Sequence, residues 1–199
     1  MSEELGEIKG HVVLVMAPTG SGKGTLVKNE MAKHPDMYHT VSCTSRYPRP
    51  GEVNGKHYHF VTREEFDHKI TKGEFIEWAE FAGNKYGTLK SEILPRLSKL
   101  GVIILEIEIQ GVEQLRKLLP AENMTIVYIE AGGWEILKAR AQTRAPMSDG
   151  EIEARYQRYL IEIQSKPLAN VIINNSSDIE VAKAEFAEVI NSAYQKCKS

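Results

Sequence analysis

Residues 12–28 read VVLVMAPTGSGKGTLVK, and this stretch decides the fold. An apolar, β-branched run breaks into a glycine-rich turn with one lysine, and helical spacing of apolar residues follows. A strand, a turn and a helix N-terminus in that order are typical of a phosphate-binding loop. Gly20 and Gly22 would let the backbone approach a ligand, so that successive N–H groups point at an anion. The alternative is a glycine-rich turn that binds nothing.

The same loop supplies side chains that a nucleotide needs. Lys23 is placed to reach the β- and γ-phosphates. The residue after it is normally a hydroxyl that contacts Mg²⁺, but here it is Gly24, so Thr25 is the candidate for the metal role, directly or through water. Ala17 stands where glycine is usual. The residues predicted to bind ATP here are Ala17, Pro18, Thr19, Gly20, Ser21, Gly22, Lys23, Gly24 and Thr25.

The composition fits one compact domain with inserted parts. The chain has 199 residues, of which 42% are hydrophobic and 26% charged. A net charge of −2 argues against broad binding to nucleic acids or anionic membranes, so any anion site must be a local basic cluster. Cys43 and Cys197 fit neither a metal site nor a needed disulfide. With no signal peptide and no membrane-spanning run in view, we expect a cytoplasmic protein.

Strands and helices alternate along the chain. Buried-strand runs lie at 12–17, 102–108, 125–131 and 170–174, with a shorter one near 40–45. Helical patterns lie at 23–34, 112–119 and 178–196. This alternation predicts a parallel sheet with helices on both faces, a three-layer α/β/α fold that binds ligands at the carboxyl ends of its strands.

Two segments interrupt the alternation. Residues 46–101 are rich in aromatic, charged and turn residues and look like an inserted lobe, with a capping box at Thr62 and Glu65. Residues 134–166 look like a helical hairpin, with a second capping box at Ser148 and Glu151.

Two arginines and a tyrosine in residues 41–60 suggest a phosphate site. Arg46 and Arg49 lie three residues apart, and prolines stiffen the backbone beside them. Two guanidinium groups held in this way suit a monophosphate, because each can bind two of its oxygens. Tyr58 can add an O–H donor. The alternative is a solvated basic turn in a surface loop.

A single carboxylate in residues 73–93 could read a base. Glu77 lies between apolar neighbours, and a carboxylate there can accept from two adjacent donors, as guanine presents at N1–H and the 2-amino group. Adenine presents an acceptor at N1, so it would leave polar groups unpaired. Thr88 and Ser42 could face the O6 side of the base, and Tyr86 the phosphate. The alternative, a solvent-facing acid on a strand, fits the pattern alone slightly better.

Glu106 and Glu108 alternate at the end of the strand run 102–108. Acidic groups beside a phosphate loop typically hold Mg²⁺, its waters or a substrate amine. Either residue could instead face solvent at the end of the strand.

The hairpin 134–166 carries four arginines. Arg140 and Arg144 share one helix face, and Arg155 and Arg158 share another. Two such faces that meet across a short loop can close over a triphosphate and stabilise its charge. Arginines on a helix can also serve solubility only, with Glu151, Glu153 and Glu162 as partners, and for Arg158 that is the interpretation we favour.

Together these residues resemble the guanylate kinase family over roughly residues 9–195. The motifs that carry the resemblance are GSGKGT, TSRYPRPGEVNGKHYHFV, FIEWAEFAGNKYGT and LEIEIQG, in this order. The resemblance implies a P-loop core at 1–41, 99–134 and 167–199, a nucleotide-monophosphate lobe at 42–98 and a lid at 135–166. It also implies transfer of the γ-phosphate of ATP to GMP, and to dGMP, with Mg²⁺.

The resemblance also implies roles for individual residues. Lys23, Arg144 and Arg155 would contact the phosphates being transferred. Arg140 and Asn174 would lie on the ATP side. The residues implied for GMP are Ser42, Arg46, Arg49, Tyr58, Glu77, Tyr86, Thr88 and Glu106, and those for the metal are Thr25 and Glu106.

The chain departs from the family pattern in four places. Gly24 replaces the P-loop serine, and glutamates replace the aspartates usual at 106 and 108. Residues 131–133 read AGG where Pro-Pro is usual, and the lid reads RAPMSDGE at 144–151. Two rival hypotheses stay open: an inactive guanylate-kinase-like scaffolding module, and a kinase of the same build with another acceptor, such as AMP or a sugar phosphate.

Overall fold

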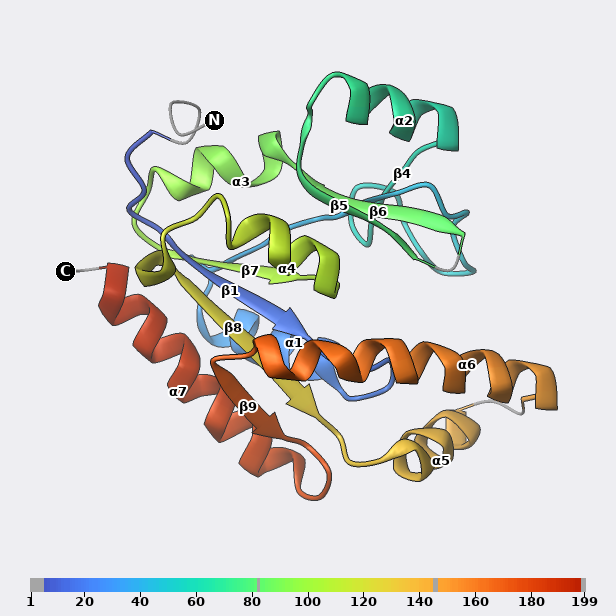
Figure 1. Cartoon of the computed structure of the whole chain (residues 1–199). Coiled ribbons are helices and arrows are strands. Elements are labelled where there is room, and N and C mark those ends of the chain that lie inside the picture. The colour runs from blue at the N-terminus through green and yellow to red at the C-terminus, as the bar shows by residue number, and fades with distance from the viewer. Residues whose placement is uncertain (1–5, 82, 145–146, 198–199) are drawn as a thin grey trace.

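A five-stranded parallel sheet lies at the centre of the molecule, with helices on both of its faces (Figure 1). The computed structural model describes residues 6–81, 83–144 and 147–197, without the side chain of Arg144. Across the sheet the strands are β2 (Tyr38–His39), β7 (Val102–Glu106), β1 (His11–Met16), β8 (Met124–Glu130) and β9 (Val171–Asn174). Every neighbouring pair is parallel, as the alternation of strands and helices predicted.

Different helices cover the two faces, because successive side chains of a strand point to opposite sides. The helices that flank the sheet are α1 (Lys23–Lys33), α3 (Lys90–Leu97), α4 (Ile109–Leu115) and α7 (Ile179–Cys197). On β1, Val13 and Val15 belong to the core cluster that includes α1 and α7. Val12 and Leu14 belong to the cluster on the other side, with α3 and α4. The predicted three-layer α/β/α architecture is therefore confirmed.

A second, mixed sheet forms a lobe beside the core. Its strands lie in the order β4 (His59–Phe60), β3 (Cys43–Thr44), β6 (Asn84–Leu89) and β5 (Phe75–Phe81), and α2 (Arg63–Thr71) packs on it. Phe66 of α2 stacks on Phe75 of β5 with ring centroids 4.3 Å apart. The predicted capping box is present, since the side chain of Thr62 accepts from the backbone N–H of Glu65 and the Glu65 carboxylate accepts from that of Thr62.

The short strand predicted near residues 40–45 is only partly right. Strand β3 falls in that range but belongs to the second sheet, where it pairs with β4 and β6. The edge strand of the core sheet is β2, which begins two residues before the predicted range. The Thr40 N–H still donates to the Ile104 carbonyl before the chain leaves the core. The sequence between the two strands contains no turn signal that would have separated them.

Two helices project from the carboxyl end of the core as a hairpin. They are α5 (Trp134–Arg144) and α6 (Asp149–Glu162), and Figure 1 shows α5 beyond the end of β8 and α6 running between the edge of the molecule and its centre. Trp134 packs against Tyr156 and Tyr159 with ring centroids 5.2 and 5.9 Å apart. The second predicted capping box is also confirmed, because Ser148 and Glu151 bond reciprocally at the start of α6. Short 3₁₀ helices lie at η2 (Ala121–Asn123) and η3 (Ile163–Leu168).

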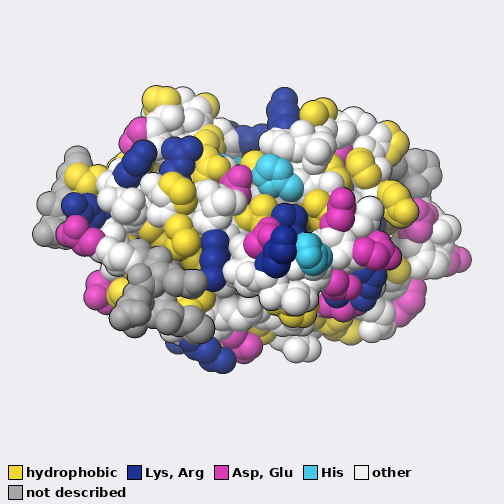
Figure 2. Space-filling view, turned by 90° about the horizontal axis from the view of Figure 1, so that it is seen from above, with side chains coloured by type: hydrophobic (Ala, Val, Ile, Leu, Met, Phe, Trp, Pro, Cys, Tyr) yellow, Lys and Arg dark blue, Asp and Glu magenta, His cyan; other side chains and the backbone are white. Residues whose placement is uncertain are grey.

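The surface is mixed in charge. Figure 2 shows Lys and Arg side chains interspersed with Asp and Glu over the face that it draws. In the part of the chain that the structure describes, no helix is long and apolar enough to cross a membrane.

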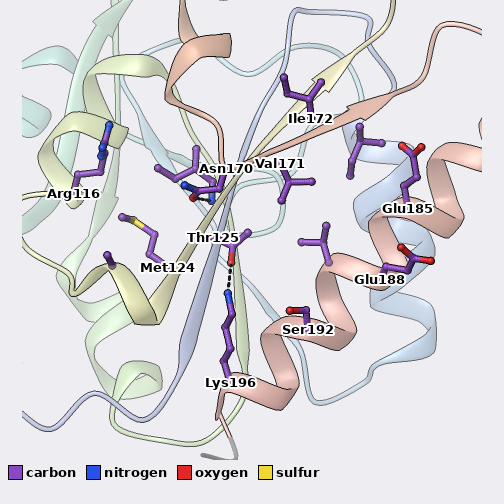
Figure 3. Close-up of a pocket in the computed structure, with 14 residues that line it drawn as sticks. Arg116, Met124, Thr125, Asn170, Val171, Ile172, Glu185, Glu188, Ser192 and Lys196 are labelled. Atoms are coloured by element: carbon purple, nitrogen blue, oxygen red, sulfur yellow. Dashed lines mark hydrogen bonds between the residues drawn. The ribbon is translucent and has the colours of Figure 1, made fainter.

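A cavity of about 640 Å³ lies between α7 and strands β8 and β9 (Figure 3). Met124 and Thr125 at the start of β8, Asn170 just before β9, and Lys196 on α7 contribute to its lining. These are the amino ends of the strands, whereas ligands of open parallel sheets bind at the carboxyl ends. The cavity therefore lies at the opposite end of the sheet from the glycine-rich turn that follows β1.

Candidate active site

The glycine-rich turn follows β1 and leads into α1, as predicted. Gly22 is the N-cap of α1 and has a left-handed backbone with φ of 90°. A Cβ at this position would collide with the amide nitrogen of Asn175, whose Nδ2 donates to the Ser21 carbonyl at 2.7 Å. Glycine is thus required here both by conformation and by close packing.

Asn175 rather than Asn174 packs against this turn. Asn175 is buried, whereas Asn174 is exposed and its backbone N–H donates to the Glu185 carboxylate at 3.3 Å. Sequence reasoning selected Asn174 and missed its neighbour. Nothing local separates the two asparagines, because the difference comes from a contact with a turn about 150 residues earlier in the chain.

Lys23, at the first position of α1, faces a carboxylate from the core. Its Nζ lies 3.3 Å from Glu106 Oε2, and His39 Nε2 lies 3.5 Å from Glu106 Oε1. Burial acts to raise the pKa of Glu106, but the hydrogen bond from His39 and the charge of Lys23 outweigh it and lower the pKa to about 2. Glu106 is therefore ionised at neutral pH. Thr25 lies exposed in the first turn of the same helix.

Glu108 does not continue the strand, contrary to the predicted range 102–108. Strand β7 ends at Glu106, and Glu108 is the N-cap residue of α4, which begins three residues before the predicted helix 112–119. Arg158 Nη2 lies 3.7 Å from Glu108 Oε1. Burial raises the pKa of Glu108, although the charge of Lys23 acts in the opposite sense. The two carboxylates therefore lie in different surroundings, one beside the P-loop and one beside the hairpin.

Glu77 is buried on strand β5, which resolves the choice that its sequence neighbours left open. Only 6% of it is exposed, and Thr88 Oγ1 on the adjacent strand β6 donates to Glu77 Oε1 at 2.6 Å. Burial raises the pKa of Glu77 to about 7, and the hydrogen bonds from Thr88 only partly oppose it.

Gly111 makes room for the second oxygen of Glu77. A Cβ on Gly111 would collide with Glu77 Oε2 and with the side chain of Ile107. Helix α4 can therefore pack this closely on β5 only with glycine at this point. The glycine was visible in the motif LEIEIQG, but its contact with Glu77 was not.

Three of the predicted phosphate-binding residues meet on the lobe. The Arg46 guanidinium lies over the rings of Tyr58 and Phe60, at 5.4 and 5.7 Å from their centroids, and the Tyr58 and Tyr86 rings lie 6.2 Å apart. Burial raises the pKa of Tyr58, and the charges of Lys23 and Glu106 also act on it. The tyrosine therefore lies within electrostatic range of Lys23 and Glu106.

The remaining lobe residues lie around this group. The Ser42 carbonyl accepts from the His59 N–H at 2.9 Å, which joins β4 to the segment before β3. Arg49 is exposed at the turn between β3 and β4. Thr88 is fully buried behind Glu77.

The hairpin arginines are placed differently from one another. Arg140 Nη2 donates to the Asn175 carbonyl at 2.8 Å, which holds it near the P-loop. Arg155 is exposed on α6. The side chain of Arg144 lies outside what the structure describes.

The interpretation favoured for Arg158 is only partly right, because the residue pairs with Glu162 as expected but also contacts another part of the chain. Its Nε donates to Glu162 Oε1 at 2.7 Å, and its guanidinium lies 4.5 Å from the centroid of the Phe81 ring at the end of β5. Glu162 in turn accepts from the backbone N–H and the hydroxyl of Thr19, at 2.8 and 3.0 Å. Arg158 thus contacts the lobe while its partner Glu162 contacts the P-loop.

The sequence named Glu162 only as a possible surface partner of the helix arginines, and its contact with Thr19 was missed. The spacing of Arg158 and Glu162, four residues apart on one helix, was visible, but such a pair is usually a surface salt bridge. Its burial against Thr19 follows from the way in which α6 returns to the core. A small cavity, lined in part by Ala17, Phe81 and Glu162, marks the place where core, lobe and hairpin meet.

Fold and site together define a P-loop phosphotransferase architecture. A parallel sheet presents a glycine-rich loop and a lysine at the carboxyl end of β1, and a separate lobe carries a group of arginine and tyrosine side chains. A helical hairpin with further arginines completes the site. Such positive groups stabilise phosphoryl transfer mainly by positioning and electrostatics.

Comparison with known proteins names the family. The family model described as Guanylate kinase matches residues 9–193. A guanylate kinase of Synechococcus sp. is 40% identical over 179 residues, which cover 89% of this chain and 97% of that protein. One of Streptomyces coelicolor is 36% identical over 181 residues, 91% of each chain. The crystal structure of guanylate kinase from Anaplasma phagocytophilum matches with a TM-score of 0.74 at 26% identity and covers 98% of this chain and 91% of that chain. The chain belongs to the guanylate kinase family.

Proposed function

We propose that this protein transfers the γ-phosphate of ATP to GMP, giving ADP and GDP. One observation carries the choice of acceptor: a buried carboxylate, Glu77, is oriented by Thr88 at 2.6 Å and lies on the lobe that also carries Arg46, Tyr58 and Tyr86. Membership of the guanylate kinase family supports the same reaction.

Base selection rests on matched hydrogen bonding. The Glu77 carboxylate accepts from N1–H and the 2-amino group of guanine, while Ser42 faces the O6 side. Thr88, predicted for that side as well, instead donates its hydroxyl hydrogen to Glu77 and orients the carboxylate. Adenine would place its N1 acceptor against the carboxylate, and a buried mismatch of this kind can discriminate by several orders of magnitude. None of these groups reads the ribose 2′-hydroxyl, so the proposal includes dGMP as a substrate.

In this proposal, phosphoryl transfer depends on positively charged and hydrogen-bonding groups from two sides, the GMP lobe and the P-loop with its hairpin. On the acceptor side, Arg46, Arg49, Tyr58 and Tyr86 hold and neutralise the GMP phosphate, which attacks in line. On the donor side are Lys23, the loop amides of residues 17–25, Arg144 and Arg155, with Arg140 and Asn174 toward the nucleoside of ATP. Enclosing both nucleotides lowers the entropic barrier and excludes water that would hydrolyse ATP.

The proposal includes Mg²⁺ bound with ATP. Within 6–81, 83–144 and 147–197, no group of three or more His, Cys, Asp or Glu side chains is placed to hold a metal by itself. Mg²⁺ is usually held by one or two protein ligands together with substrate phosphates and waters. Glu106, ionised beside Lys23, and the exposed hydroxyl of Thr25 are the residues that would hold it. Bound there, the ion would neutralise charge on the β- and γ-phosphates.

The same proposal divides the chain into three working parts. The core comprises 1–41, 99–134 and 167–199, the GMP lobe 42–98, and the lid 135–166. The second sheet, which lies within residues 43–89, and the hairpin of α5 and α6 support these boundaries. Two free, buried cysteines support the expected location in the reducing cytoplasm.

The affinity for GMP should depend on pH through Glu77. Its raised pKa of about 7 means that the carboxylate is largely protonated below that pH and cannot accept from both guanine donors. We expect the apparent KM for GMP to rise about tenfold between pH 8 and pH 6, because the competent fraction falls by that factor. Steady-state kinetics at each pH, with ATP saturating, measure this. In the Glu77→Gln variant, the pH dependence of KM for GMP that Glu77 causes should disappear. If KM for GMP still rises as steeply at low pH in that variant, its pH dependence comes from the GMP phosphate instead.

Substitution at Gly111 should disturb the same carboxylate. In Gly111→Ala the new methyl group displaces Glu77 Oε2, so we expect KM for GMP to rise roughly tenfold while KM for ATP stays within about twofold. Gly150→Ala is the control, since a Cβ there meets open space. An equal rise in both KM values would show general damage to the fold.

A panel of nucleoside monophosphates with Mg-ATP tests the proposed function. We expect GMP and dGMP to support ADP formation, with AMP, CMP, UMP and sugar phosphates lower in kcat/KM by a factor of about 10³ or more. No ATP consumption with any acceptor would favour the inactive scaffolding module. Equal use of AMP would overturn base selection by Glu77.

A further inference from the structure

The Arg46 guanidinium is already held by a carboxylate from its own loop. Its Nη1 donates to Glu52 Oε2 at 3.0 Å and its Nη2 donates to Glu52 Oε1 at 2.9 Å. A further bond runs from Nη1 to the Tyr47 carbonyl at 2.7 Å. With Tyr58 and Phe60 against its face, the guanidinium is fixed in both position and plane.

These hydrogen bonds occupy one edge of the Arg46 guanidinium and leave a second edge available to a ligand. An arginine side chain has five N–H donors, two on each Nη and one on Nε. The three bonds above use both hydrogens of Nη1 and one of Nη2. The edge formed by Nε–H and the second Nη2–H carries no hydrogen bond to the rest of the described chain. That edge is a fork of the kind that binds two phosphate oxygens.

Glu52 also shapes the backbone at the second arginine. Its Oε2 accepts from the Arg49 backbone N–H at 2.7 Å, and its own N–H donates to the Arg49 carbonyl at 3.0 Å. The turn from Arg49 to Glu52 is thereby held by one backbone hydrogen bond and one side-chain hydrogen bond. One carboxylate thus sets the plane of Arg46 and the starting point of the Arg49 side chain.

We propose that Glu52 is a positioning residue for the acceptor phosphate, which holds Arg46 by one edge so that the other faces the phosphate of GMP. Glu52 itself does not touch the substrate. Its hydrogen bonds with Arg46 and the Arg49 amide lower the pKa of Glu52 to about 2, so the arrangement persists through the neutral range. The inference rests on the proposed function, because it takes GMP as the acceptor.

Glu52→Gln tests this role with little change in size. The variant keeps one acceptor and loses the charge, so Arg46 is held less firmly. We expect KM for GMP to rise roughly 10- to 100-fold, while kcat at saturating GMP and KM for ATP stay within about threefold. Glu52→Asp, one methylene shorter but still charged, should fall between wild type and Glu52→Gln.

Glu80→Gln is a matched control on the same lobe. Glu80 also pairs with an arginine, since Arg63 Nη2 donates to it at 2.9 Å, but that pair is exposed and belongs to no assigned site. Its kinetics should match wild type. Melting temperatures of all variants should agree within a few degrees, which separates positioning from loss of fold.

A second comparison tests whether Glu52 affects the KM for GMP through Arg46. In an Arg46→Lys background, the fork is absent, so Glu52→Gln should add much less to KM for GMP than it does in wild type. Full additivity would overturn the inference.

Two other results would also overturn it. A lower KM for GMP in Glu52→Gln would mean that Glu52 competes with the phosphate for Arg46, and an unchanged KM would mean that the contact is only structural. Calorimetric titration of GMP into wild type, Glu52→Gln and Glu52→Asp separates failure of the inference about Glu52 from failure of the proposed function. If wild type binds GMP but forms no GDP, the reaction assignment fails while the binding comparison still decides the role of Glu52.

Discussion

Lys23→Met is expected to fold normally and to lose about 10³-fold in kcat. Methionine is unbranched like lysine and only one atom shorter, so it suits the partly buried position beside Glu106, but it brings no charge to the phosphates. Removal of one group that stabilises developing charge typically costs two to three orders of magnitude in kcat. A coupled assay with Mg-ATP and GMP measures the loss, and circular dichroism checks the fold.

Lys33→Met provides the matched control for this experiment. Lys33 lies at the other end of α1 and pairs with Glu30 at 2.7 Å, so its loss removes a lysine from the same helix without touching the P-loop. Its kcat should stay within about twofold of wild type. Near-normal turnover by Lys23→Met would refute the phosphate role of Lys23.

Glu77→Gln is expected to reduce kcat/KM for GMP by about 10³, with KM for ATP changed by less than about threefold. The glutamine amide keeps one acceptor but turns a donor toward a guanine donor, so one bond is lost and one contact becomes repulsive. Kinetics with each nucleotide varied in turn measure the two effects separately. Equal losses for GMP and ATP would contradict base selection by this side chain.

The stability of Glu77→Gln provides an internal check. The pKa of Glu77 in the folded protein, about 7, lies above its ordinary value of 4.5, so folding is favoured at low pH and that stabilisation is lost as the pH rises through 7. A neutral glutamine avoids this cost. At pH 8 the variant should therefore melt no lower than wild type, and a clear drop in melting temperature would indicate a packing defect.

Features that depend on neighbours in sequence were predictable. The strand, turn and helix around Lys23 were clear because spacing and glycine placement encode them locally, and the two capping boxes because each needs only a pair of residues three apart. The parallel sheet followed from alternation of elements.

Features that depend on distant partners were not predictable. Arg158 was taken for a solvated residue because its contacts, Glu108 and Phe81, come from other parts of the chain. Asn175 against Ser21 and Gly111 against Glu77 are likewise long-range packing contacts. The position of β2 was missed because two strands of two residues each, in different sheets, are separated by only three residues.

The hydrogen bonds between Glu162 and Thr19 hold the C-terminal end of helix α6 against the glycine-rich loop, so Glu162 is the fulcrum about which the helix can pivot. Arg155 lies seven residues from that fulcrum, about 10 Å along the helix axis, and the Ser148 end lies at about twice that distance. A small swing about the fulcrum therefore carries the helix tip farthest and Arg155 about half as far, while Thr19 is almost stationary. In the proposed reaction, the hairpin can thus open to admit or release a nucleotide while the glycine-rich loop keeps its arrangement.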